Sequence, residues 1–226
     1  MKTVKKPKNT LVISDLHFPY QNKYYLEFLE ETSRKWKCNE VVQVGDMFDM
    51  HRVSRHTPEP ESISMDEEIN RGIIEVKRLA SVFPKMSVCY GNHDKRAEKV
   101  AKDSGITKRM LVDIADLFEC PKSWEWKYEH VIDGVIYFHG DGYSGVKGAI
   151  DAGMKKRSSV AIGHLHSFGG VIYQNNGYSR IFGLNTGCLI DDKQPAFAYA
   201  SSCKDKPTLG CGIVIEGIEA YFVPMN

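Results

Sequence analysis

The fold of this chain is decided by a stretch near its beginning, Leu11-Val12-Ile13-Ser14-Asp15-Leu16-His17. Residues 11–14 form a short apolar run typical of a buried strand, and Asp15 stands where that strand would end. The same arrangement, an apolar run followed at once by polar residues, recurs at 41–44 before Gly45-Asp46, 86–90 before Gly91-Asn92, 135–138 before His139, and 159–162 before Gly163-His164. Because open α/β sheets place ligands beyond the carboxyl ends of their strands, we expect these polar side chains to lie together.

Helices are expected between these strands. Apolar residues at helical spacing predict a helix over 22–36 with Asn22 as its cap, and a second over 64–83. The second helix begins with the capping box Ser64-x-x-Glu67 and is ended by Pro84. Two further helices are predicted over 107–118 and 145–156.

The second half of the chain has the pattern of antiparallel strands. Asp133-Gly134 predicts a tight hairpin between two short runs. The strands expected in this half are 129–132 with 135–138, 170–174 with 178–182, and the closing segments 196–202 and 212–223. An alternating first half and an antiparallel second half predict an α/β fold of two packed sheets with helices outside.

The composition indicates a soluble protein of one domain, residues 1–226, with no internal repeat or linker. Thirty basic and 29 acidic residues leave a formal charge of +1, which gives no sign of a strong global field for nucleic acid or membranes. The six cysteines are scattered, which is typical of reduced thiols in a cytosolic protein. The apolar run 11–13 is too short for a signal peptide or a membrane span. We therefore expect a cytoplasmic protein without membrane contact.

The strand-end residues together form a set of metal ligands. Two carboxylates, one amide oxygen and four imidazoles are available for a pair of ions: Asp15, Asp46, Asn92, His17, His139, His164 and His166. His93 and Asp49 are left for proton chemistry. One such histidine alone would more often be a structural residue, and one such aspartate a helix cap. The order of all nine residues is what favours metal chemistry, with oxygen and nitrogen ligands that suit Mn²⁺, Fe²⁺ or Zn²⁺.

The motifs Asp15-x-His17, Gly45-Asp46-x-x-Asp49, Gly91-Asn92-His93-Asp94, His139-Gly140 and Gly163-His164-x-His166 resemble those of the calcineurin-like metallophosphoesterases. The resemblance extends from Asp15 to about Leu189, and the whole is similar to small stand-alone members from bacteria and phages. It implies a four-layer α/β/β/α sandwich of two mixed sheets flanked by helices. The stretch 185–189 departs from the family's Asn-Pro-Gly-Ser-Leu, with Thr for Pro and Cys for Ser.

The resemblance also implies a role for each residue. One metal would be held by Asp15, His17 and His166, and the other by Asn92, His139 and His164, with Asp46 bridging the two. His93 would act on the scissile phosphate as general acid or transition-state stabiliser, and Asp49 would orient its imidazole. Manganese is the expected metal, with Fe, Zn or Ni as alternatives, and the nucleophile would be a hydroxide between the ions.

Substrate choice depends on segments outside these motifs. Arg52, Arg55 and His56 follow the second motif closely and are candidate substrate contacts, against the alternative of a solvated helix start. Residues 50–63 and 95–128 are candidate substrate-facing insertions. Met50-His51 in place of Arg-Gly disfavours the protein Ser/Thr phosphatase branch.

The sequence thus predicts a phosphodiesterase acting on nucleotides or nucleic acid, since His93 can protonate a poor alkoxide leaving group. A broad phosphomonoesterase is the close alternative. A catalytically silent scaffold of the same fold, binding a partner, is the alternative from a different class.

Overall fold

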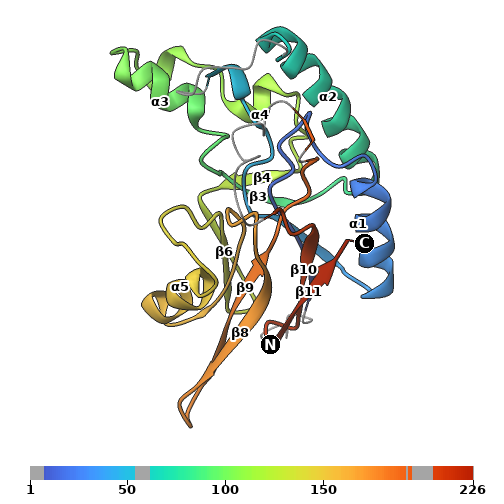
Figure 1. Cartoon of the computed structure of the whole chain (residues 1–226), viewed down its shortest axis with the longest axis vertical. Helices are drawn as coiled ribbons and strands as arrows, with labels where there is room; N and C mark the ends of the chain where they lie inside the picture. The colour runs from blue at the N-terminus through green and yellow to red at the C-terminus, as the bar shows by residue number, and fades with distance from the viewer. Residues whose placement is uncertain (1–7, 54–61, 192, 195–205, 226) are drawn as a thin grey trace, which may run out of the picture.

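Eleven strands and five α-helices are found in the computed structural model, which describes residues 8–53, 62–191, 193–194 and 206–225 (Figure 1). The strands are β1 (Asn9–Ile13), β2 (Glu40–Gln43), β3 (Ser87–Cys89), β4 (Glu125–Lys127), β5 (Glu129–Ile132), β6 (Val135–Phe138), β7 (Ser159–Ile162), β8 (Gly169–Asn175), β9 (Arg180–Thr186), β10 (Gly210–Ile215) and β11 (Glu219–Pro224). The helices are α1 (Tyr25–Lys35), α2 (Met65–Val82), α3 (Arg96–Asp103), α4 (Ile114–Leu117) and α5 (Gly148–Lys156), with short 3₁₀ turns η1 (His51–Val53) and η2 (Lys108–Met110).

The strands form two mixed sheets. The first has six strands in the order β11-β10-β1-β2-β3-β4, and the second has five in the order β5-β6-β7-β9-β8. Strands β1 to β4 run parallel to one another, as do β6, β7 and β9. Each sheet therefore has one edge where several carboxyl ends come together.

The period of two along a strand assigns the strand residues to different layers. In β1, Leu11 and Ile13 pack against α1, α2 and α4, whereas Val12 faces the second sheet. Beyond the second sheet, α5 packs its alanines against β6 and β7. Figure 1 shows α1 and α2 on one side of the strands and α5 on the other. The four-layer α/β/β/α sandwich expected from the sequence is confirmed.

The turn chemistry explains two of the hairpins. Asp133 and Gly134 both have positive φ, 48° and 79°, which a tight two-residue hairpin turn requires, and Ile132 pairs with Val135 across it. The second predicted hairpin is β8 with β9. The predicted closing strand 212–223 is instead a pair, β10 and β11, because Glu216 and Gly217 turn the chain with positive φ.

The prediction of one helix over 107–118 is wrong. The segment contains η2 and the one-turn helix α4, separated by extended backbone at Leu111. The Asp113 side chain accepts a hydrogen bond from the Ala115 N–H and starts a new helix there, which competes with continuing the old one. Helix α3, just before this segment, was not predicted at all. The expected strand 196–202 lies outside the described residues.

Among the described residues, no helix is both long and apolar enough to cross a bilayer. Four of the cysteines, Cys89, Cys120, Cys188 and Cys211, are buried. Buried free cysteines of this kind pack as small apolar residues.

Gly72 of α2 allows the close approach of Phe118, whose ring stacks on Phe48 just before Asp49. A Cβ at residue 72 would lie 2.5 Å from the Phe118 ring. We expect Gly72→Ala to lower the free energy of unfolding by about 1–3 kcal/mol, despite the better helix propensity of alanine. Urea denaturation measures this, with exposed Asn70→Ala of the same helix as the control. An unchanged or raised midpoint for Gly72→Ala would contradict the packing.

Candidate metal centre and catalytic site

The predicted site residues lie in the loops that follow the parallel strands. Backbone hydrogen bonds continue between these loops after the strands end. The Asp15 N–H donates to Gly45 O at 3.1 Å, and the Gly163 N–H donates to His139 O at 3.0 Å. The motifs are therefore fixed to one another by the main chain before any side chain contributes.

The backbone is strained at four of the predicted ligands. Asp15, His17, Asp46 and His164 have φ of 49°, 50°, 52° and 69°, in the left-handed region that side chains other than glycine seldom adopt. Such conformations cost of order 1–3 kcal/mol each and persist where the surrounding structure fixes them, typically at functional sites.

Two motif glycines are required by close packing against these carboxylates. A Cβ at Gly91 would lie 2.1 Å from Asp46 Oδ1, and one at Gly163 would lie 2.4 Å from Asp15 Oδ2. Both contacts are far inside van der Waals distance. Any side chain at these positions would displace a carboxylate of the site.

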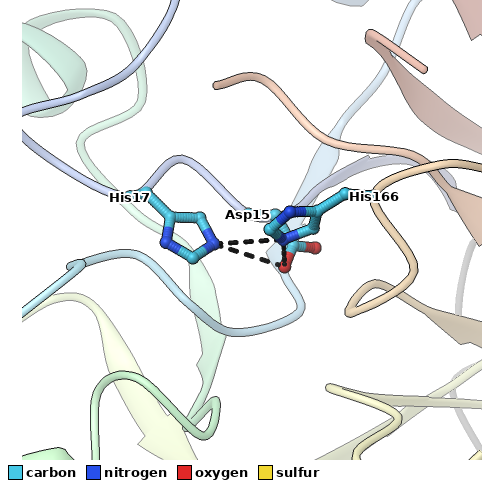
Figure 2. A group of neighbouring side chains, drawn as sticks. All are labelled: Asp15, His17 and His166. Atoms are coloured by element: carbon cyan, nitrogen blue, oxygen red, sulfur yellow. Dashed lines mark hydrogen bonds and ion pairs between the residues drawn. The ribbon is translucent and has the colours of Figure 1, made fainter. Parts of the chain in front are cut away.

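Asp15, His17 and His166 form the first cluster, and Figure 2 shows the three side chains converging. His166 Nε2 lies 3.0 Å from Asp15 Oδ1 and 3.2 Å from His17 Nε2. The other oxygen of Asp15, Oδ2, accepts hydrogen bonds from the His164 N–H at 2.9 Å and from the Ser14 hydroxyl. One carboxylate oxygen is thus held by the protein and the other faces the cluster.

Asp46, His139 and His164 form the second cluster. His139 Nε2 lies 3.1 Å from Asp46 Oδ2, 3.2 Å from His164 Nδ1 and 2.9 Å from Asn92 Oδ1. On the opposite side of the ring, His139 Nδ1 donates to the Val44 carbonyl at 3.0 Å. Since a carbonyl only accepts, this bond leaves the Nε2 lone pair directed into the cluster.

Asp46 joins the two clusters through a single atom. Its Oδ1 accepts a hydrogen bond from the His93 N–H at 2.7 Å. Its Oδ2 is 3.1 Å from His139 Nε2 of the second cluster and 3.9 Å from His17 Nε2 of the first. The structure therefore brings the seven predicted ligands into two neighbouring clusters, with Asp46 Oδ2 near one histidine of each.

The electrostatics of the clusters fit divalent cations. Burial alone would lower the pKa of His17 and His139, but the neighbouring carboxylates outweigh it and raise these pKa values to about 10 and about 9. The same pairing holds the pKa of Asp15 and of Asp46 below the ordinary range, against the opposing effect of burial. Each cluster therefore contains an ionised carboxylate that a positive charge would stabilise. The nitrogen and oxygen donors beside it suit Mn²⁺, Fe²⁺ or Zn²⁺.

Asp49 orients two imidazoles. Its Oδ1 lies 2.7 Å from His17 Nδ1 and 3.0 Å from His93 Nδ1. Burial opposes ionisation of Asp49, but these two histidines keep its pKa well below the ordinary value. An ionised carboxylate only accepts, so both Nδ1 atoms carry hydrogen and both Nε2 atoms face away from Asp49. This use of Nδ1 also argues against a third metal among these three residues.

His93 lies beside the shared oxygen, with its Nε2 3.9 Å from Asp46 Oδ2. Burial, with the charge of His17, lowers the pKa of His93 although Asp46 and Asp49 act in the opposite direction. On the other side, Arg96 Nη2 lies 3.1 Å from His93 Nε2. Arg96 lies outside the strand-end motifs and was not among the predicted site residues.

Asp94 supports the loops that contain the ligands, a role that was not predicted from the sequence. Its fully buried carboxyl group accepts hydrogen bonds from the Asp46, Phe48 and Gly91 N–H groups at 3.0, 3.0 and 2.8 Å. These bonds fasten the loop after β2 to the loop after β3. The fourth residue of Gly-Asn-His-Asp is the signal in the sequence, because an aspartate there can accept from neighbouring backbone.

Glu68 of α2 holds the turn that follows Asp49. Its Oε1 accepts a hydrogen bond from the His51 N–H at 2.9 Å, and its Oε2 is buried without a hydrogen-bond partner among the described residues. Burial, with the nearby charge of Asp49, raises the pKa of Glu68 to about 7. The helical pattern could not identify this residue, since nothing in the sequence separates it from Glu67, which is exposed, or from Glu75, which is half-buried.

Of the three predicted substrate contacts, Arg52 is the one that lies in the described part of the chain, and its hydrogen bonds to main-chain carbonyls lie outside the clusters. Arg52 is exposed and donates to the Ile63 carbonyl at 2.8 Å and to the Ser62 carbonyl, so it connects the two ends of the 50–63 segment. Arg55 and His56 lie outside the described residues. In the other candidate insertion, 95–128, β4 extends the first sheet and Phe118 packs in the core, so α3 and η2 are its outlying parts.

The fold and the clusters define an α/β protein with histidine–carboxylate groups that could hold metal ions, and the family comparison agrees. Residues 8–182 match the family model of the calcineurin-like phosphoesterases. The match covers well over half of the chain, so the chain belongs to this family. A hydrolase acting on phosphate esters is therefore the supported class of activity.

Solved structures with the same fold include a metallophosphoesterase from Sphaerobacter thermophilus, at 16% identity and a TM-score of 0.51, covering 97% of this chain and 88% of that one. The E. coli phosphoesterase YfcE matches at 15% identity and a TM-score of 0.46, covering 96% and 100%. Vacuolar protein sorting 29 from Cryptosporidium parvum matches at 14% identity and a TM-score of 0.44, covering 92% and 86%. At 16% identity, the likeness to the Sphaerobacter protein shows the fold alone. A comparison with curated proteins found no match.

The raised pKa of Glu68 makes a prediction about stability against pH. The unfolded chain ionises Glu68 above about 4.5, whereas the folded protein does so only above about 7. Stability is therefore lost as pH rises from 4.5 to 7, with a limiting slope of about 1.4 kcal/mol per pH unit. Urea unfolding of wild type and Glu68→Gln at pH 4.5 to 7.5 measures the difference. The wild type should lose stability relative to the variant across this window, and parallel curves would contradict the assignment.

Proposed function

We propose that this protein is a dinuclear metal-dependent phosphoesterase that hydrolyses phosphodiester bonds of nucleotides or nucleic acid. The observation that carries the proposal is Asp46 Oδ2, which lies within 4 Å of a histidine nitrogen in each of two ligand clusters. A shared carboxylate oxygen is what two ions about 3.5–4 Å apart require. Membership of the calcineurin-like phosphoesterases supports the reaction class.

One ion would be held by Asp15, His17 and His166, and the other by His139, His164 and Asn92, with Asp46 common to both. When bound, two divalent ions lower the pKa of a shared water and neutralise the oxygens of a phosphate group. Manganese is the proposed metal, with Fe, Zn or Ni as alternatives, because carboxylate, amide and imidazole donors suit all of these ions and the described clusters contain no thiolate.

His93 would act on the leaving group. Asp49 fixes its Nδ1–H, so that Nε2 faces the space beside the shared oxygen of Asp46. A proton carried at Nε2 would be given to the departing alkoxide, which leaves poorly as an anion. This contribution is greatest for an ester whose leaving group is an alcohol of high pKa, as in a nucleotide phosphodiester. A phosphomonoester of such an alcohol would draw on the same donor, so a phosphomonoesterase is the close alternative.

Replacing His93 should remove the proposed proton donor. For metal-stripped protein supplied with Mn²⁺, we expect hydrolysis of bis-p-nitrophenyl phosphate and of a dinucleotide phosphodiester. His93→Ala should lower kcat by about 10²–10⁴-fold for the dinucleotide, the usual contribution of a general acid, and by less for the nitrophenyl ester, whose leaving group departs readily as an anion. His130→Gln is the matched control, since His130 is buried elsewhere and hydrogen-bonds the Val88 carbonyl. A wild type that prefers p-nitrophenyl phosphate would identify a phosphomonoesterase. Absence of turnover with any of these esters, metal being bound, would favour a scaffold.

Replacing Asp46 should weaken metal binding in both clusters. Asp46→Asn removes the negative charge that both clusters use, so we expect Mn²⁺ binding to fall from two equivalents to one or fewer. Calorimetric titration of the metal-free protein measures this directly and does not depend on a substrate. Asp151→Asn on α5 is the control for loss of a carboxylate. Two equivalents bound by Asp46→Asn with unchanged affinity would remove the bridging role.

A further inference from the structure

Arg96, the first residue of α3, reaches back into the site from outside the metal clusters. Its side chain is only 18% exposed. Nη1 donates to the Asp49 carbonyl at 2.7 Å and lies 3.5 Å from Asp49 Oδ2. Nη2 lies 3.1 Å from His93 Nε2. The two ends of the guanidinium fork therefore contact the two residues assigned to proton chemistry.

The direction of the second contact follows from Asp49. Because His93 Nδ1 donates to this carboxylate, the neutral ring has its lone pair on Nε2, and Arg96 Nη2 is the donor to it. A guanidinium cannot accept a hydrogen bond. Arg96 thus covers the ring nitrogen that would face a leaving group, beside the shared oxygen of Asp46, which is 3.9 Å from the same nitrogen.

The hydrogen-bond donors of Arg96 are incompletely used among the described residues. Its shortest hydrogen bond goes to the neutral Asp49 carbonyl, and its ion pair with Asp49 Oδ2 is longer, at 3.5 Å, while Oδ1 of that carboxylate bonds to His17 and His93 at 2.7 and 3.0 Å. A guanidinium has five N–H donors in a planar fork, and the described residues supply two acceptors within hydrogen-bond distance. The remaining donors are available to an anion at the mouth of the site.

We propose that Arg96 binds a non-bridging oxygen of the scissile phosphate. In this arrangement Nη1 stays on the Asp49 carbonyl as an anchor, while Nη2 transfers from His93 Nε2 to the phosphate oxygen. The transfer frees the Nε2 lone pair of His93 as the substrate arrives. Nε2 can then take up a proton from solvent and pass it to the leaving oxygen, after which the ring is neutral again. The inference rests on the proposed function, since it assumes a phosphate ester at the Asp46 oxygen.

Lysine could not replace arginine here. A single ammonium nitrogen is a point charge and cannot span the Asp49 carbonyl and a phosphate with two separate N–H arms, as the planar fork does. The alternative role for Arg96 is structural, as the tether of α3 to the loop containing Asp49. A purely structural residue would change folding and activity together and would leave the affinity for phosphate unaltered in the folded protein.

The experiment compares Arg96→Ala and Arg96→Lys with the control Arg34→Ala, an exposed arginine paired with Glu30 on α1. For Mn²⁺-loaded protein we measure hydrolysis of bis-p-nitrophenyl phosphate and calorimetric binding of inorganic phosphate. Arg96→Ala should lower kcat/KM by about 10²–10³-fold, the usual loss for one donor to a transition-state oxygen, and should weaken phosphate binding at least tenfold. Arg96→Lys should recover only a small part of either. Arg34→Ala should match the wild type.

The outcomes separate the two proposals. Unchanged phosphate affinity in Arg96→Ala, whatever its hydrolysis, would overturn the role of Arg96 and leave the phosphoesterase standing. Loss of bound Mn²⁺ or of thermal stability in both Arg96 variants would make the residue structural and would also overturn it. If the wild type binds phosphate through Arg96 but hydrolyses neither test ester, the proposed function fails and the anion site remains. A wild type that binds no phosphate would refute the inference.

Discussion

The buried carboxylate of Asp49 is the contact on which the geometry of the site depends. One oxygen accepts hydrogen bonds from His17 and His93, so a single negative charge sets the tautomer and direction of both rings. His17 then presents Nε2 to Asp15 and His166, while His93 presents Nε2 to the opposite side of Asp46. The backbone carbonyl of the same residue anchors Arg96. Metal binding and proton transfer would therefore be aligned by one residue that contacts neither metal nor substrate.

Burying several carboxylates in one place is unfavourable, and main-chain N–H groups offset this by donating hydrogen bonds to them. Each ligand carboxylate gives one oxygen to a main-chain N–H, from His164 for Asp15 and from His93 for Asp46. Asp94 then takes three more N–H groups of the same loops. Charge-assisted bonds of this kind are strong enough to keep the left-handed conformations of the ligands in place. Leu16, Met47 and Phe48 of the same loops are buried in the core, so hydrogen bonds and apolar packing hold the loops together.

The sequence predicted the layered fold and the grouping of the ligands because both follow from buried strands. A run such as Leu11–Ile13 alternates between two cores, and the residue after it is positioned by the sheet, so Asp15 and Asp46 could be located from pattern alone. Helix α3 gave no such signal, since of its residues only Ala101 is buried. Its helix-forming composition and Gly105, which ends it with a φ of 73°, were the available clues. The split at Asp113 depended on a local side-chain bond that apolar periodicity cannot register.

The same distinction explains why Arg96 and Glu68 were missed while His93 was found. His93 belongs to a short motif at a strand end, where position follows from the sheet. Arg96 and Glu68 act from helices, and their contacts with Asp49 and His51 depend on how each helix is placed against the strand-end loops. The position of a strand-end motif follows from the sheet, whereas the contacts of these two helical side chains do not. Specificity in this protein should be sought first on α3, the polar helix that starts three residues after His93.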